Sequence, residues 1–259
     1  MLDIVCTSGP HDRPFDEWYS WTCISVVLSG TFSYRTGCGS ALMSSGALLL
    51  GNAGDSYECS HEHGEGDRCI SFQFAPELFE RIASNVGVSR SRFEHGRIPP
   101  LRSLNPLLAR AHVALTGCDS FEEIGLELVA AVFRASGQLG RNPDVSALDR
   151  ARIAPLLRRL ASRSAEHHTL AEMAGSARLS RYHFLRTFKN VAGVTPHQFL
   201  LRLRLRDAAT RLATSEDPIT EIALDAGFDD LSNFIRGFRA EFGLVPRRYR
   251  AVARGGRCS

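Results

Sequence analysis

The sequence lacks any apolar run long enough to cross a membrane, and its N-terminus lacks the features of a secretion signal. No stretch reaches the roughly 18 apolar residues that a membrane-spanning helix needs, and MLDIVCTSGPHDR has neither a basic start nor an apolar core. The seven cysteines are an odd number and are spread thinly along the chain. Without an export signal, such spacing does not indicate a disulfide framework. We therefore expect a cytoplasmic chain with reduced thiols.

Lysine is almost absent, because every basic residue except Lys189 is arginine. The net charge of +3 hides an asymmetry. Residues 1–146 carry 11 basic against 17 acidic side chains, a net −6, whereas residues 147–259 carry 20 against 11, a net +9. A basic module of this size fits a polyanionic partner. Arginine suits paired contacts to phosphate and guanine, although a bias in genome composition explains the preference equally well.

The acidic half predicts strands followed by helices. Within residues 16–75, the segments TCISVVLSG, TFSYRTG, GALLLGNAG and RCISFQF are β-branched or apolar runs separated by glycine and serine. Strands at such close spacing indicate a small barrel or sandwich. Apolar residues then recur at helical spacing over about 77–139, starting with Pro76 at the first helical position.

The last predicted helix of this half is SFEEIGLELVAAVFRASG, with Asp119 or Ser120 as its N-cap. Its broad apolar stripe either packs on the barrel or forms a dimer interface, and the sequence leaves both interpretations open. GRNPDVSALD at 140–149 has the Gly and Asn-Pro signals of a linker. We therefore expect one domain over 1–142 and a second over 147–254.

The basic half contains an internal repeat. LAEMAGSARLSRYHFLRTFKNVAGVTPHQFL matches ITEIALDAGFDDLSNFIRGFRAEFGLVPRRYR at an offset of 49 residues before the turn and 50 after it. Each copy predicts a short helix, a tight turn and an amphipathic helix, which is a helix-turn-helix at about 169–191 and again at about 218–242. We expect Asp217 to cap the second copy and Pro155 to kink or break the helix upstream of the first.

With these motifs, the chain from about Ile153 to Arg250 resembles the DNA-binding domain of AraC/XylS-type transcription regulators. The matching segments are LAEMA, LSRYHFLRTFK, GVTPHQFL, RLRLRDAATRLA, ITEIALDAGFDD, SNFIRGFRAEFG and VPRRYR. The resemblance implies that the second helix of each motif enters the major groove, about one turn of DNA apart. It also implies which side chains reach DNA: Arg181, Tyr182, Leu185, Arg186, Lys189, Leu231, Ser232, Asn233, Arg236 and Arg239.

Chemistry divides these DNA-binding candidates into classes. Arg186 and Arg236 suit guanine and Asn233 suits adenine, whereas Arg181, Lys189 and Arg239 suit phosphate. The alternative is a solvated basic helix face, which two copies at matched spacing disfavour. In the same family the N-terminal part is often a cupin-like barrel that binds a small effector, followed by helices that dimerise. The expected fold class is therefore α+β with two domains, a cupin-like barrel with following helices and an all-α, homeodomain-like double helix-turn-helix.

The segment YECSHEHGEGDRC is dense in possible metal ligands. Cys59, His61 and His63 alternate, so they share one face of a strand, and Cys69 follows. Two thiols and two imidazoles form a tetrahedral set that suits zinc, nickel or copper. The motif departs from metal-binding cupins, since Glu65 comes only two residues after His63. Three interpretations remain: an ordinary polar strand end, a metal site, or a site for an organic effector or redox-reactive thiols.

The function predicted from these features is sequence-specific transcription regulation, with activation the commoner outcome in the family. The expected partners are double-stranded promoter DNA, RNA polymerase, a small effector and a second copy in a homodimer, with no membrane. No enzymatic activity is expected. One alternative is a metal-dependent cupin enzyme, or a metal or redox sensor, fused to a DNA-binding domain; the enzyme would need a further histidine ligand, which His95 and His112 do not convincingly supply. Another is a constitutive architectural DNA binder.

Overall fold

The computed structural model describes residues 1–9, 11–12, 15–61, 63–64, 66–85, 87, 91–116, 120–140 and 145–255. Three features named above lie outside these ranges: the possible cap Asp119, the nearby Glu65, and residues 141–144 of the predicted linker. No helix in the described part of the chain is long and apolar enough to cross a membrane.

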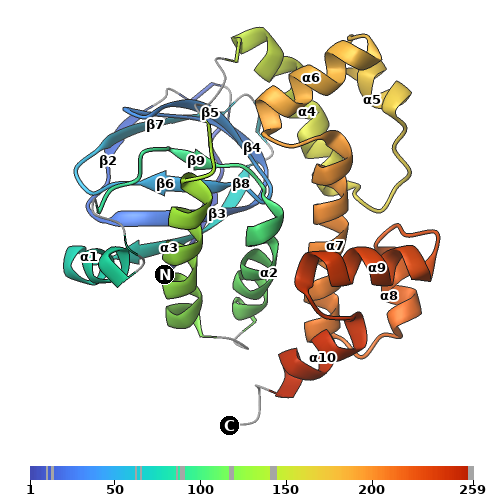
Figure 1. The fold of residues 1–259 in the computed structure, drawn as a ribbon. Coiled ribbons are helices and arrows are strands. Elements are labelled where there is room, and N and C mark those ends of the chain that lie inside the picture. The colour runs from blue at the N-terminus through green and yellow to red at the C-terminus, as the bar shows by residue number, and fades with distance from the viewer. Residues whose placement is uncertain are drawn as a thin grey trace.

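The N-terminal half contains two antiparallel sheets that face each other (Figure 1). The first has the order β1-β8-β3-β6-β9 and the second has the order β2-β7-β4-β5. The strands are β1 (Leu2–Cys6), β2 (Phe15–Trp18), β3 (Thr22–Ser29), β4 (Thr31–Thr36), β5 (Gly39–Ser44), β6 (Leu48–Gly51), β7 (Ser56–Ser60), β8 (Asp67–Phe74) and β9 (Arg97–Ile98). Among the described residues the strand pairs form two separate sheets rather than one continuous barrel.

The four strands expected from apolar runs are confirmed as β3, β4, β6 and β8. Strands β1 and β9 lie outside the expected range of 16–75. They were missed because each is an edge strand with no useful burial pattern: β1 is mostly exposed, and β9 has only two residues. β1 nevertheless matters, since it pairs along its whole length with β8 and brings Cys6 opposite Asp67.

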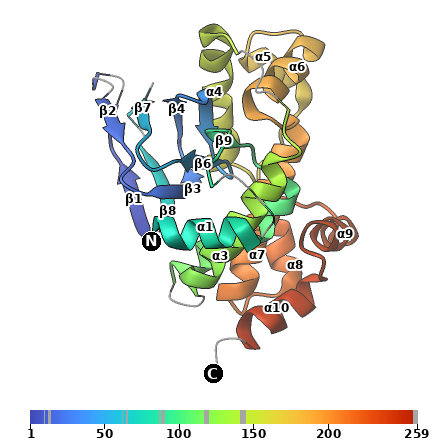
Figure 2. The same ribbon diagram turned by 60° about the vertical axis from the view of Figure 1, so that its left-hand side comes forward.

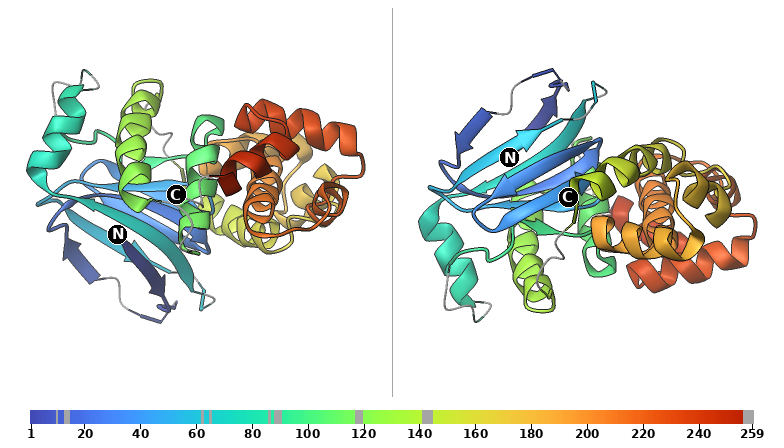
Figure 3. Two further views of the ribbon diagram at one scale, coloured as in Figure 1. Left: turned by 90° about the horizontal axis from the view of Figure 1, so that it is seen from below. Right: turned by 90° about the horizontal axis from the view of Figure 1, so that it is seen from above.

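Three helices cover the outer face of the first sheet (Figure 3). They are α1 (Pro76–Asn85), α2 (Asn105–Ala114) and α3 (Phe121–Ser136), and a 3₁₀ turn (Arg102–Leu104) precedes α2. Ser120 caps α3 by accepting the backbone N–H of Glu123. The apolar stripe of α3, including Leu128 and Val132, is fully buried in the core under the sheet. Of the two interpretations of that stripe, packing within the chain is the one that the structure supports.

The C-terminal half is all helical. Its elements are α4 (Ala147–Ser162), α5 (Leu170–Ser176), α6 (Arg181–Ala192), α7 (Pro196–Thr214), α8 (Ile219–Asp225), α9 (Leu231–Phe242) and α10 (Pro246–Gly255). Helix α7 runs along the length of this half, with α5 and α6 at one end and α8, α9 and α10 at the other (Figures 1 and 2). Each end has its own core, and α7 contributes to both. The predicted fold class, a β-rich N-terminal part and a double helix-turn-helix, is confirmed.

Two local predictions were wrong, a helix break at Pro155 and a cap at Asp217. Helix α4 continues through Pro155, because buried residues on both sides of the proline, such as Ala154 and Leu157, hold it in the core. Helix α8 begins after Pro218 without a side-chain cap, and Asp217 does not cap it. The Asp217 carboxylate instead accepts hydrogen bonds from Arg211 at 3.0 Å and from the Ser215 hydroxyl at 2.8 Å.

The N-terminal half is anchored to both helix-turn-helix units. The buried Arg97 of β9 donates to the carbonyl oxygens of Val191 (2.8 Å) and Ala192 (2.6 Å), the last residues of α6. At the other unit, Arg102 donates to the Ala240 carbonyl and pairs with Glu241 of α9 at 3.7 Å. Helix α2 packs against both α7 and α9. Both helix-turn-helix units are therefore in contact with the same acidic half.

Candidate functional site

Helix α6, the second helix of the first repeat, divides sharply into a buried face and an exposed face. Ser180 caps its start by accepting the N–H of His183, and Gly193 ends it in the left-handed conformation. Phe184 and Phe188 are fully buried in the core with α4 and α7. All five predicted contact residues of this helix are exposed: Arg181, Tyr182, Leu185, Arg186 and Lys189.

Helix α9 repeats this arrangement. The Asp230 carboxylate accepts the backbone N–H groups of Ser232 (3.1 Å) and Asn233 (3.0 Å), and Gly243 ends the helix in the left-handed conformation. Phe234 and Phe238 are fully buried. The five predicted contact residues are again exposed: Leu231, Ser232, Asn233, Arg236 and Arg239. The phenylalanines of both helices therefore form cores, as their spacing predicts, and do not face DNA.

The exposed basic groups of the two helices lack acidic neighbours. Within the described residues, no carboxylate lies within ion-pair distance of Arg181, Arg186 or Lys189 on α6, or of Arg239 on α9. Arg236 donates to the side-chain oxygen of Asn233 on its own helix. Exposed cations without carboxylate partners are available to phosphates and base edges. If these faces were only solvated, their basic side chains would be expected to form surface ion pairs with neighbouring carboxylates.

The arginines of α7 have a structural role that the sequence did not reveal. The guanidinium of Arg204 donates to the carbonyl oxygens of Ser164 (2.7 Å), Glu166 (2.8 Å) and Gly227 (2.7 Å). Arg202 donates to the Pro100 carbonyl at 2.6 Å. Burial lowers the pKa of Arg206 to about 10. The side chains of Arg202 and Arg204 thus bind backbone carbonyls of neighbouring elements, and they fix the position of the long middle helix.

A second feature is a cavity of about 510 Å³ in the N-terminal half. Its wall is aromatic and thiol-rich, with Tyr19 and Tyr57 stacked at 4.2 Å between ring centroids. Two carboxylates, Glu17 and Asp67, line it together with His61, and no arginine or lysine is among the described residues of its wall. The described lining residues are Ile4, Cys6, Glu17, Trp18, Tyr19, Ser20, Trp21, Cys23, Ser25, Phe32, Leu49, Tyr57, Cys59, His61, Asp67, Cys69, Ser71 and Gln73.

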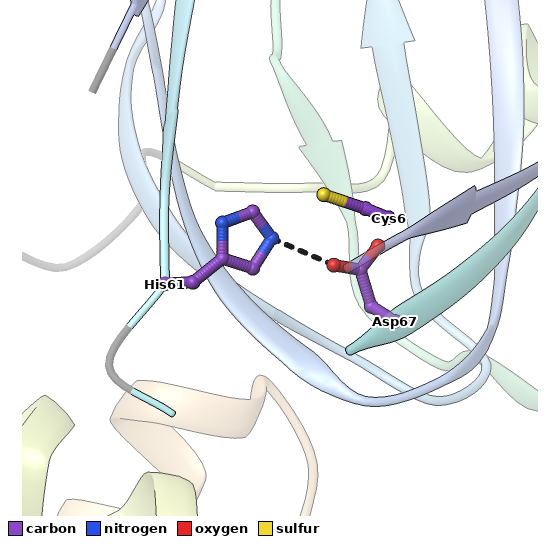
Figure 4. A group of neighbouring side chains, drawn as sticks. All are labelled: Cys6, His61 and Asp67. Atoms are coloured by element: carbon purple, nitrogen blue, oxygen red, sulfur yellow. Dashed lines mark hydrogen bonds and ion pairs between the residues drawn. The ribbon is translucent and has the colours of Figure 1, made fainter. Parts of the chain in front are cut away.

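The predicted set of Cys59, His61, His63 and Cys69 does not form a single site in the structure. Three of them line the cavity, but His63 does not. The ring of His63 instead donates through Nε2 to the Thr31 carbonyl at 2.7 Å. The potential ligand atoms that lie within 4.8 Å of one another belong to Cys6, His61 and Asp67 (Figure 4). Sequence spacing could not reveal Cys6, because only the pairing of β1 with β8 brings it there.

The chemistry of the thiols disfavours a redox-reactive pair. Burial is the main cause that raises the pKa of Cys59 to about 12, and it also raises the pKa of Cys69. The thiolate is the nucleophile, so such thiols are poorly reactive near neutral pH. The enzyme alternative also gains no support, since neither His95 nor His112 lines the cavity.

Comparison with known proteins agrees with this geometry. Residues 173–251 match the family model of a helix-turn-helix domain. The transcriptional activator RhaS of Yersinia pestis is 30% identical over 185 residues, which are 68% of this chain and 67% of RhaS. The probable transcriptional regulator LumQ of Photobacterium leiognathi is 36% identical over 86 residues, so the match spans only 35% of LumQ and 33% of this chain.

A solved structure also resembles the C-terminal half. The DNA-binding domain of the transcription factor AdpA, in complex with a target DNA, is 29% identical with a TM-score of 0.40, and covers 41% of this chain and 96% of that domain. The match to RhaS extends well beyond the helix-turn-helix region. The chain belongs to the AraC family of transcription regulators, which is a family of DNA-binding proteins rather than enzymes.

Proposed function

We propose that the chain regulates transcription by reading two successive major-groove faces of promoter DNA with α6 and α9. The observation that carries this proposal is the pair of matched helices. Each is capped at its start, buried on its phenylalanine face and exposed on its basic face. Exposed basic side chains on a helix that enters the major groove suit phosphates and base edges.

The ten predicted contact residues form the proposed DNA surface. Arg186 and Arg236 are each placed in the middle of an exposed helix face, where a guanidinium has the reach to pair with guanine. The hydrogen bond from Arg236 to Asn233 orients the arginine in the free protein, and it would be exchanged for base contacts. Lys189 and Arg239 lie in the last turn of their helices, which fits contacts to the flanking phosphates.

Two recognition helices in one chain mean that a monomer can read an asymmetric site. Binding sites selected from genomic fragments by the full chain would define that site. Arg186→Ala and Arg236→Ala should each weaken binding by about 1–3 kcal/mol and relax preference at one base pair. Arg134→Ala removes the same charge from an exposed position on α3 in the acidic half, and it should change neither the DNA affinity nor the base preference. Unchanged affinity and base preference in both recognition-helix variants would contradict the assignment.

We further propose that the acidic half, residues 1–142, controls the DNA-binding half, residues 147–254, through a small effector in the cavity. The contacts of Arg97 with α6 and of Arg102 with α9 support this proposal, because they join the cavity-bearing half to both units. A homodimer and contact with RNA polymerase complete the proposal, and the name of RhaS as an activator favours activation. Since its ligand is chromosomal DNA, the chain would work in the cytoplasm. Transcript profiling of a deletion strain tests the direction of regulation.

A further inference from the structure

We propose that the effector is a thiophilic divalent metal ion, of which Zn²⁺ is the test case, bound in the cavity by Cys6, His61 and Asp67. This inference rests on the proposed function, since it names the chemical class of the effector. It shares only His61 with the set predicted from the sequence, which was Cys59, His61, His63 and Cys69. Cys6 and Asp67 belong to the site, and His63 does not.

The three side chains reach one point from both sheets. Cys6 and Asp67 are direct cross-strand neighbours in β1 and β8, so their side chains project to the same face of the first sheet. His61 comes from the end of β7, in the opposite sheet. Their sulfur, nitrogen and oxygen atoms all lie within 4.8 Å of one another, and the three side chains point toward a common centre (Figure 4).

The charge balance of the cavity favours a cation. The side chains of His61 and Asp67 are only 4% and 6% exposed, and His61 Nε2 donates to Asp67 Oδ2 at 2.7 Å. No arginine or lysine is among the described residues that line the cavity, although Glu17 adds a second carboxylate. A buried carboxylate is costly unless it is paired or coordinates a metal. A divalent cation would compensate the buried Asp67 carboxylate directly.

The donor set selects the kind of metal. One thiol, one imidazole and one carboxylate suit zinc and its neighbours in the transition series, whereas magnesium and calcium prefer oxygen ligands alone. In a tetrahedral zinc site with bonds of about 2.0–2.3 Å, ligand atoms lie about 3.3–3.8 Å apart. Binding would therefore lengthen the 2.7 Å between His61 Nε2 and Asp67 Oδ2, because the metal replaces the hydrogen bond between these two atoms. Two further thiols, Cys59 and Cys69, line the same cavity and are the candidates for a fourth ligand.

Contacts lead from this site to the DNA-binding half. His63, two residues after His61, is hydrogen-bonded to Thr31. Arg158 of α4 donates to the hydroxyl of the same threonine at 3.0 Å. Helix α4 packs against α6, the first recognition helix. A ligand that changes the position of His61 therefore acts close to a contact between the two halves.

The first experiment measures binding alone. Full-length chain is stripped with chelator and titrated with Zn²⁺ by calorimetry and with Co²⁺ by absorption, which reports thiolate coordination directly. We expect one high-affinity ion per chain. Cys6→Ser, His61→Gln and Asp67→Asn should each weaken binding by at least about 100-fold, more than loss of an outer-shell partner does. The controls Cys38→Ser and His63→Gln should bind as the parent does.

The results of this titration distinguish a metal site from its absence. Absence of stoichiometric Zn²⁺ binding by folded wild-type chain, or undiminished binding in all three ligand variants, would overturn the metal site. Equal loss in Cys38→Ser would also overturn it, because that thiol is exposed and outside the cavity. Circular dichroism of each metal-free variant shows whether it is folded, and the conservative changes to serine, glutamine and asparagine keep volume and polarity.

The second experiment measures DNA affinity with and without Zn²⁺. Wild-type affinity for its selected site should change at least about fivefold, the lower end of typical coupling between two sites, and the three ligand variants should bind DNA without this response. If wild type and variants bind DNA but none responds to Zn²⁺, the metal is not the effector and the proposed DNA function stands. If none binds specific DNA under any condition, the proposed function itself is wrong.

Discussion

The two helix-turn-helix units offer a matched pair of glycines that tests how the halves are joined. Gly193 and Gly243 occupy the same position in the repeat, directly after α6 and α9, with φ of +79° and +74°. A methyl group at Gly243 would meet nothing within 4 Å, whereas a Cβ at Gly193 would lie 2.4 Å from Cβ of Pro99. Alanine in the left-handed region costs about 1–2 kcal/mol. We expect that cost alone for Gly243→Ala.

For Gly193→Ala we expect an additional cost of about 1–3 kcal/mol, because a rigid proline ring of the other half must move. Urea unfolding followed by circular dichroism gives the free energies. A double-mutant cycle isolates the contact, since Pro99→Gly should recover at least about 1 kcal/mol in the Gly193→Ala background and nothing with Gly243→Ala. Equal costs for the two glycines, with no coupling to Pro99, would refute this account of the interface.

Three further changes probe other parts of the structure. Arg97→Ala should lower the free energy of unfolding by about 2–4 kcal/mol in a urea titration, because two charge-assisted hydrogen bonds are lost and the cost of burying the charge is partly recovered; a change below 0.5 kcal/mol would contradict its anchoring role. Asp230→Ala should cost about 1 kcal/mol by thermal unfolding, since it caps α9, whereas the adjacent Asp229→Ala should cost less. At pH 8, Cys38 should be alkylated much faster than Cys23, whose pKa is raised to about 12 by burial; peptide mass spectrometry measures both rates, and equal rates would argue against the buried position.

The helix-turn-helix half was largely predictable because its signals are local. Helical spacing put Phe184 and Phe234 in cores, and the caps Ser180 and Asp230 fixed where the recognition helices begin. Such patterns depend on residues within one or two turns of each other. The prediction for Asp217 failed although its partners are also local, since Arg211 and Ser215 bind the carboxylate that capping would have used.

The cavity and its ligands were less predictable because they depend on strand pairing. The alternation of Cys59, His61 and His63 was only partly informative, since Cys59 and His61 line the cavity but His63 does not, and β7 ends at Ser60. Cys6 and Asp67 meet them only through the pairing of β1 with β8. The spacing of residues in a single sequence does not show which strands pair with each other. The same limit applies to Arg97, whose target carbonyls lie in the other half of the chain.

The positions of the two anchors constrain how any effector can act. Arg97 holds the last carbonyls of α6, and Arg102 holds Ala240 and Glu241 at the end of α9. In the repeat these are equivalent ends, opposite to the capped starts of the same helices. One acidic half therefore touches both recognition helices away from their exposed contact faces. Under the proposed function, a ligand in the cavity would alter the separation or tilt of α6 and α9 without competing with DNA. Because the two units must fit groove faces about one helical turn apart, a small change in that geometry is enough to change affinity.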